Sequence, residues 1–160
     1  MWTVMASPIG DLRIVERDVS IVAIEFSPFN PPADGRPLGA RSDAEPVLVE
    51  TVRQLTAYFN RELTDFDLPL APVGTDFQRR VWAELARIAY GETATYGEIA
   101  GKLGMTNAAS RAVGLANGRN PVPIVVPCHR VIGASGTLTG YAGGLGRKQQ
   151  LLELEQDALF

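Results

Sequence analysis

The chain of 160 residues is 46% hydrophobic and 21% charged. This length holds one medium domain or two small ones, and the composition is typical of a globular protein, which excludes disorder throughout. No apolar run is long enough for a transmembrane helix, and residues 1–10 lack the basic cluster and apolar core of a secretory signal. We therefore expect a cytoplasmic protein that acts without a membrane.

Charge is distributed unevenly, although the net charge is only −3. Residues 1–74 contain six basic and eleven acidic side chains, a balance of −5, whereas residues 75–148 contain nine basic and four acidic ones, a balance of +5. Between Gly101 and Lys148 there is no Asp or Glu. A basic second half favours binding to phosphate groups; the alternative is a solvated surface with uneven charge.

The N-terminal segments predict three strands. Residues 2–6, 12–15 and 21–26 are short runs rich in β-branched side chains. Residues 8–11 and 17–20 have the composition of turns between them. Short turns between consecutive strands predict an antiparallel sheet.

A loop, a helix and a linker are expected next. Residues 29–46 are rich in proline, glycine and polar side chains, which predicts a loop. Residues 45–61 predict a helix, because apolar residues recur on one face: Leu48, Val52, Leu55 and Phe59. Residues 68–74 contain two prolines and a glycine, so we place a domain boundary there.

The second half begins with a helix that carries its own start signal. Thr75 and Gln78 form a capping box. An apolar stripe follows, made of Phe77, Val81, Leu85 and Ile88, and Tyr90-Gly91 is expected to close the helix.

Two shorter helices follow. A second capping box, Thr95 with Glu98, predicts a helix over residues 96–102. After a turn that contains glycine, Asn107 is expected to cap a third helix over residues 108–116. Two short helices joined by such a turn predict a helix-turn-helix. The whole chain is thus expected to be mixed α/β (α+β): a small N-terminal domain with an antiparallel sheet and a helix, then a mainly helical domain.

The third helix has little side-chain bulk. Its small residues and the glycine that follows are Ala108, Ala109, Ser110, Ala112, Gly114, Ala116 and Gly118. Such a helix can approach a narrow groove of a duplex, and the alternative is close packing inside the protein. Packing does not explain Arg111, a long cation suited to reaching into a duplex.

The chain has one cysteine, Cys128, and one histidine, His129. No internal disulfide can form, and a Cys/His zinc cluster has too few ligands, so no metal is expected. A lone thiol is most often a small buried apolar group, so its role depends on the residues around it.

The surroundings of this cysteine resemble a known family. Residues 127–130, Pro-Cys-His-Arg, follow an apolar run that Asn120-Pro121 precedes. Further blocks have the order and spacing of the same family: 74–82, 90–93, 96–100, 111–114 and 139–145. Over residues 74–155 the sequence resembles the O6-alkylguanine-DNA alkyltransferases, and it is more loosely similar to them at 7–10, 58–59 and 66–68.

The resemblance implies a ribonuclease-H-like N-terminal domain over residues 1–70 and a DNA-binding and alkyl-transfer domain over residues 74–160. It implies DNA repair by direct reversal, carried out by a methylated-DNA–protein-cysteine S-methyltransferase. Such a protein binds double-stranded DNA through the minor groove and flips the damaged base out of the helix. It then moves the alkyl group from O6-alkylguanine, and also from O4-alkylthymine, irreversibly to Cys128. We expect a monomer that acts once and needs no cofactor.

The nucleophile must be a thiolate, which a nearby base favours. Neighbouring side chains point in different directions, so His129 is expected to reach Cys128 through a bridging water. The resemblance implies that Glu155 orients His129 in a Glu–His–water–Cys relay.

The resemblance also assigns residues to the base and to DNA. Tyr96 serves the guanine ring as a donor, and Asn120 holds the active-site loop in shape. The segment 136–144 closes over the base, and the base pocket comprises Val131, Tyr141, Ala142 and Gly143, with backbone contacts from Cys128, Val131 and Ala142 to the guanine edge. The DNA-binding residues are Arg111, which enters the duplex in place of the flipped nucleotide, and Ala112, Gly114, Tyr96 and Thr95.

Three other functions are open to this sequence. A cysteine hydrolase built on Cys128, His129 and Glu155 would turn over through an intermediate that water attacks. A lesion-binding protein without chemistry would not need the cysteine. A redox sensor would not need the basic half or Arg111.

Overall fold

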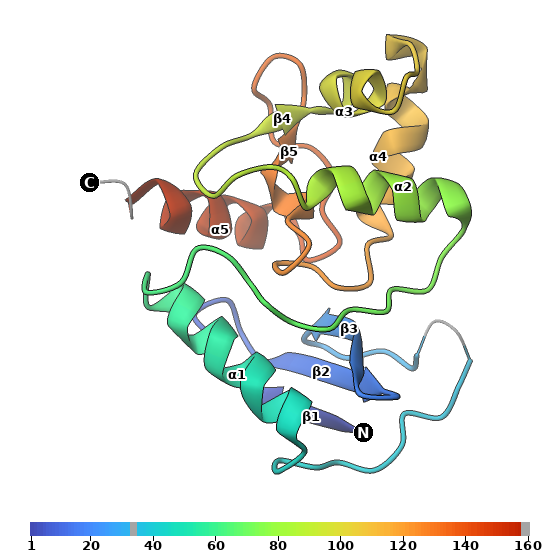
Figure 1. The fold of residues 1–160 in the computed structure, drawn as a ribbon. Coiled ribbons are helices and arrows are strands. Elements are labelled where there is room, and N and C mark those ends of the chain that lie inside the picture. Colours follow the sequence, from blue (N-terminus) through green and yellow to red (C-terminus); the bar gives the residue numbers. More distant parts are fainter. Residues whose placement is uncertain (33–34, 158–160) are drawn as a thin grey trace. The chain divides into compact units, whose positions relative to one another are not determined.

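The computed structural model describes residues 1–32 and 35–157. It divides the chain into two compact units, Met1–Pro72 and Val73–Phe160 (Figure 1). The expected fold class is confirmed, because a small antiparallel sheet with one helix is followed by a mainly helical part. Among the described residues, no helix is long and apolar enough to cross a membrane.

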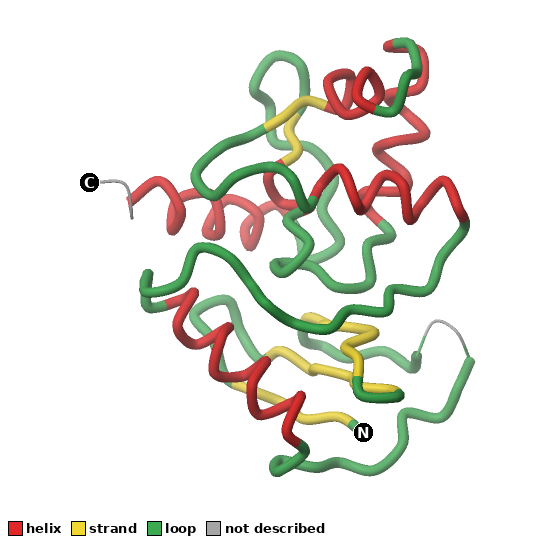
Figure 2. The backbone as a smooth tube through the Cα atoms, in the orientation of Figure 1, coloured by secondary structure: helices red, strands yellow, loops and turns green. Residues whose placement is uncertain are grey.

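The first unit is built on a sheet with the order β1-β2-β3. Its strands are β1 (Trp2–Met5), β2 (Leu12–Arg17) and β3 (Ser20–Phe26), and neighbouring strands are antiparallel. Figure 2 draws the strands in yellow. Helix α1 (Pro46–Phe59) packs against all three strands. The helix face predicted from periodicity is partly the buried one, since Leu48 and Leu55 are completely inaccessible to solvent.

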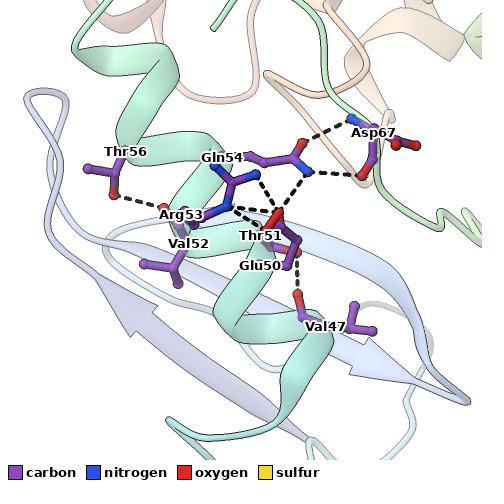
Figure 3. A network of polar contacts seen from close by, with 8 residues as sticks. All are labelled: Val47, Glu50, Thr51, Val52, Arg53, Gln54, Thr56 and Asp67. Atoms are coloured by element: carbon purple, nitrogen blue, oxygen red, sulfur yellow. Dashed lines mark hydrogen bonds and ion pairs between the residues drawn. The ribbon is translucent and has the colours of Figure 1, made fainter. Parts of the chain in front are cut away.

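A polar network fixes the segment that leaves α1 (Figure 3). The buried amide of Gln54 donates to the Asp67 carbonyl at 3.0 Å and accepts from the Asp67 amide at 2.9 Å. On the same helix, hydrogen bonds from Arg53 and Gln54 lower the pKa of Glu50 to about 2. Because a buried amide needs partners for both ends, Gln54 sets where the chain runs after the helix.

The second unit opens with α2 (Asp76–Leu85), which has the predicted capping box at Thr75. The helix ends earlier than predicted, at Leu85, and Ile88 is buried outside it. Trp82 is also buried, and its indole Nε1 donates to the Ala116 carbonyl at 2.9 Å. The core of this unit is therefore held both by the apolar stripe of α2 and by the hydrogen bond from Trp82 to Ala116, which are distant in the sequence.

Helices α3 (Tyr96–Lys102) and α4 (Ser110–Gly118) form the predicted helix-turn-helix. The predicted cap at Asn107 is wrong, because a short 3-10 helix, η1 (Asn107–Ala109), precedes α4 and Asn107 lies within it. The Asn107 carboxamide instead accepts from the Ser110 hydroxyl at 3.1 Å. It also lies so close to Gly97 that a Cβ there would collide with it, so α3 and η1 pack without room for a side chain.

Two short strands that were not predicted join distant parts of this unit. Strand β4 (Ala94–Thr95) pairs in parallel with β5 (Val131–Ile132). A 3-10 turn, η2 (Cys128–Arg130), directly precedes β5, and α5 (Leu145–Asp157) ends the described chain. The pairing brings the start of α3 next to the segment that contains the only cysteine.

Candidate active site

The thiol of Cys128 lies in η2 and is only 4% exposed. Burial raises its pKa to about 11, against the opposing effects of hydrogen bonds with Asn120 and Tyr141 and of the positive charge of Lys148. The resting side chain is therefore a neutral thiol at physiological pH. It needs a base to become a nucleophile.

The loop before the thiol is held by buried amides. Asn120 donates from Nδ2 to the Val126 carbonyl at 2.8 Å and accepts at Oδ1 from the Val122 amide at 3.0 Å. Asn117 donates to the carbonyl of Cys128 at 3.4 Å. Ile124 lies in this loop with a φ of 75°, a conformation that is costly for a β-branched residue. Such strain persists only where neighbouring contacts hold the backbone, as the amides do here.

A buried charged cluster lies directly after the thiol. Glu155 of α5 is 1% exposed, and its Oε2 is 2.6 Å from Nε2 of His129. Arg130 donates to both carboxylate oxygens, from Nε at 2.8 Å and from Nη2 at 3.0 Å. Its Nη1 donates to the Ile88 carbonyl at 2.6 Å. Arg130, which was assigned no role from the sequence, therefore holds the Glu155 carboxylate in place.

The protonation states in this cluster follow from its partners. Burial opposes ionisation of Glu155, but hydrogen bonds from His129 and Arg130 outweigh it and lower the pKa to about 2. Burial lowers the pKa of His129, against the opposing effect of Glu155. An ionised carboxylate only accepts hydrogen bonds, so the proton of a neutral His129 is on Nε2. Its Nδ1 is then an acceptor, and this buried atom has no hydrogen-bond partner among the described residues.

Lys148 is a second buried cation that the sequence interpretation left without a role. Its side chain is inaccessible to solvent, and Nζ donates to the carbonyls of Val131, at 2.5 Å, and Thr139, at 2.8 Å. Burial lowers its pKa, and the charge of an ionised Cys128 acts in the opposite direction. Lys148 therefore places a positive charge near the sulfur and ties β5 to the loop that follows it.

Tyr96 and the loop after β5 meet next to this centre. The Tyr96 hydroxyl is 2.8 Å from the Thr139 hydroxyl. Burial raises the pKa of Tyr141, and a hydrogen bond with Cys128 adds to the effect. Of the other residues assigned to a base pocket, Val131 is buried, whereas Ala142 is exposed.

Gly143 and Thr95 also have internal contacts. The Gly143 carbonyl accepts from Arg147 at 3.3 Å. The Thr95 hydroxyl accepts from the Glu98 amide at 3.1 Å and so caps α3. The cap uses the acceptor side of the Thr95 hydroxyl and leaves its O–H available as a donor.

Three of the residues assigned to DNA, namely Arg111, Ala112 and Gly114, lie on α4 and divide into two groups. Arg111 and Ala112 are exposed, and Arg111 has no hydrogen bond or ion pair with any part of the chain that the structure describes. Gly114 is half-buried, and a Cβ there would lie 3.6 Å from the Tyr96 ring. The small residue at this position therefore also serves packing between α4 and Tyr96. Leu115, one turn after Arg111, is 65% exposed. The sequence interpretation did not weigh this large apolar side chain.

The side chains of the site suit nucleophilic chemistry. Within residues 1–32 and 35–157, no group of three or more His, Cys, Asp or Glu side chains is arranged to hold a metal ion. The side chains of the site are the Cys128 thiol and the neutral imidazole of His129, whose Nδ1 has no hydrogen-bond partner among the described residues. They are joined by the Glu155 carboxylate and the phenols of Tyr141 and Tyr96. Together they can generate a thiolate and donate a hydrogen bond to its target.

Comparison with known proteins places this arrangement in a family. The chain matches the ribonuclease-like domain of 6-O-methylguanine DNA methyltransferase over residues 1–72 and the DNA binding domain of the same family over residues 76–157. It is 53% identical over 152 residues to a methylated-DNA–protein-cysteine methyltransferase of Mycolicibacterium paratuberculosis, covering 94% of this chain and 88% of the relative.

Solved structures agree with this assignment. The crystal structure of Mycobacterium tuberculosis O6-methylguanine methyltransferase superposes with a TM-score of 0.89 at 47% identity, covering 98% of this chain and 93% of that one. The structure of Mycobacterium tuberculosis OGT in complex with DNA gives a TM-score of 0.85 at 46% identity, with the same coverage. The resemblance seen in the sequence motifs is confirmed, and the chain belongs to the 6-O-methylguanine DNA methyltransferase family.

Proposed function

We propose that this protein repairs alkylated double-stranded DNA by moving the alkyl group from O6 of guanine to Cys128. The observation that carries the proposal is the buried thiol next to a neutral His129, whose Nε2 is bonded to Glu155 and whose Nδ1 is an unpartnered acceptor within the described chain. A buried base of this kind is suited to removing one proton from a thiol. The relatives named above are methylated-DNA–protein-cysteine methyltransferases, which supports the same reaction.

The chemical step follows from these positions. A water molecule between Nδ1 of His129 and the sulfur passes the thiol proton to the imidazole, and Glu155 stabilises the imidazolium that forms. The thiolate attacks the alkyl carbon, so that a carbon–sulfur bond forms and the carbon–O6 bond breaks. The electron pair of the broken bond stays on guanine, where a hydrogen bond from Tyr96 stabilises it.

The product explains why each molecule acts once. Water does not hydrolyse an alkyl thioether, so Cys128 is not regenerated. A cysteine hydrolase would instead pass through an intermediate such as a thioester, which water can attack. O4-alkylthymine carries the same type of alkyl–oxygen bond on a ring, and we include it among the substrates.

DNA is expected to bind along α4. The duplex must release the damaged nucleotide, because O6 inside the stack cannot reach a buried sulfur. Arg111 is exposed and is not engaged by any described residue, so it is free to occupy the space that the flipped base leaves. Small neighbours such as Ala112 allow the helix to lie in the minor groove. One protein molecule supplies the thiol, the base and Arg111, so we expect the monomer to be active.

Intact-protein mass spectrometry tests the proposal. Protein is incubated with an excess of duplex that contains O6-methylguanine, and both the protein mass and the repaired guanine are measured. We expect a gain of one methyl group on Cys128 and repaired guanine that never exceeds the protein. Cys128→Ser should gain nothing. Repaired guanine in excess of protein would contradict single turnover and favour a hydrolase.

A further inference from the structure

The backbone of Thr139 is held in place in the loop after β5. Its carbonyl accepts from Nζ of Lys148 at 2.8 Å, and that ammonium is held in place by a second bond to the Val131 carbonyl at 2.5 Å. The Thr139 methyl group lies near Gly133, where an added Cβ would be 3.5 Å away, an ordinary van der Waals distance. The Lys148 ammonium therefore holds the backbone of Thr139 at a defined place beside β5.

The hydroxyl of Thr139 lies within hydrogen-bond distance of a phenol. The Thr139 Oγ1 is 2.8 Å from the Tyr96 hydroxyl, and either oxygen can donate in this pair. Tyr96 is the first residue of α3, so the contact joins two segments that are 43 positions apart. No other hydrogen bond of the Tyr96 hydroxyl is found among the described residues.

The chemistry of a phenol decides what this contact does when a base is bound. A tyrosine hydroxyl has a single proton to donate but can accept at its lone pairs. If Tyr96 gives that proton to the guanine ring, Thr139 must be the donor in the pair. A hydrogen bond received at the phenol oxygen makes the phenol a stronger donor, and it fixes the rotation of the O–H.

We propose that Thr139 is a positioning residue for alkyl transfer: its hydroxyl donates to Tyr96 and turns the Tyr96 proton toward the guanine ring. This inference rests on the proposed function, because it requires Tyr96 to be the donor to the leaving base. Lys148 contributes by holding the Thr139 backbone. Thr139 itself does not touch the base in this scheme.

The test is the rate of alkyl transfer from free O6-benzylguanine, which requires no duplex to be opened. We compare the wild type with Thr139→Val, which keeps the shape but removes the hydroxyl, and with Thr139→Ser, which keeps the hydroxyl. Tyr96→Phe and the double variant complete a thermodynamic cycle. Ser135→Ala is the matched control, because Ser135 follows β5 just outside the segment 136–144, is exposed, and likewise loses a hydroxyl that bonds to a neighbouring hydroxyl, that of Thr137.

We expect Thr139→Val to slow the reaction about threefold to tenfold, the size of one neutral hydrogen bond. Thr139→Ser should recover most of the rate, and Ser135→Ala should react like the wild type. In the Tyr96→Phe background, Thr139→Val should cause no further loss. Thermal unfolding of each variant verifies that it is folded at the assay temperature.

Several results would overturn the inference. An equal loss from Thr139→Val in both backgrounds would mean that Thr139 acts through the loop and not through the phenol. If Thr139→Val reacted faster than the wild type, the hydrogen bond between Thr139 and Tyr96 would hinder the reaction and would have to break before alkyl transfer. If Tyr96→Phe reacted at the wild-type rate, the Tyr96 hydroxyl would not be the donor to guanine, and Thr139 would have no donor to orient. Failure of the proposed function is a separate outcome, since the wild type would then transfer no benzyl group to Cys128.

Discussion

Replacing Glu155 by glutamine tests the charged cluster beside the thiol. Both carboxylate oxygens accept hydrogen bonds from Arg130, and one of them also lies 2.6 Å from Nε2 of His129. A glutamine has one oxygen and one NH₂ group, so at least one of these donors would face another donor. The substitution would also leave the buried positive charge of Arg130 without its partner.

The expected loss of stability can be obtained in two ways. Removing one member of a buried ion pair costs about 3–5 kcal/mol. Independently, a fall of the pKa of Glu155 from 4.5 to about 2 corresponds to about 3 kcal/mol of unfolding free energy at neutral pH. Either value is a large part of the about 5–15 kcal/mol that stabilises a typical domain.

The sign of the pH dependence follows from the lowered pKa. Glu155 contributes stability above its unfolded value of 4.5, and that contribution is lost as the pH falls through about 2. The difference between wild type and Glu155→Gln should therefore be full at pH 7 and shrink as the pH falls from 4.5 toward 2. Urea unfolding measures it, and in a Trp2→Phe background the fluorescence of Trp82 reports on the second unit alone.

Alkyl transfer from free O6-benzylguanine should also slow, by about tenfold or more, because His129 loses the carboxylate that supports its charged form. Glu153→Gln is the matched control, because Glu153 lies on the same helix but is exposed and bonds only to Gln149 in the described structure. A Glu155→Gln protein that is as stable as Glu153→Gln, or that transfers the benzyl group at the wild-type rate, would refute this role of the carboxylate.

Two further predictions concern the base and the DNA. Burial lowers the pKa of His129 below 6.5 and raises that of Cys128 to about 11, so the transfer rate should be constant from about pH 6.5 to about pH 9 and fall only as His129 gains a proton in acid. A stopped-flow rate that climbs steadily across this range would indicate attack by free thiolate without a base. Arg111→Ala should slow repair of duplex O6-methylguanine about tenfold or more, because flipping the nucleotide costs a few kcal/mol. The rate of reaction with free O6-benzylguanine should not change, because no duplex is opened. The thermal stability should not change either, because the side chain is exposed. The loss should shrink opposite a mismatch, and equal losses on duplex and free base would exclude a role in opening the duplex.

Local patterns in the sequence predicted most of the helices and strands. The capping boxes at Thr75 and Thr95 begin α2 and α3 as expected, because caps depend on residues three positions apart. Patterns were weaker where tertiary contacts compete with them. Asn107 has the side chain of a cap, yet it lies inside η1 and packs against Gly97.

The sequence by itself determined the family and the chemical groups available to it: one thiol, one imidazole, and a basic segment without acidic residues. Only the tertiary structure decided which of those groups meet. Glu155 and Arg130 are 25 positions apart in the sequence, and Tyr96 and Thr139 are 43 apart. At such separations the periodicity of helices and strands does not predict which residues are in contact. Burial decided the rest, because Arg130 and Lys148 are indistinguishable from surface cations until the fold removes them from water and gives them partners.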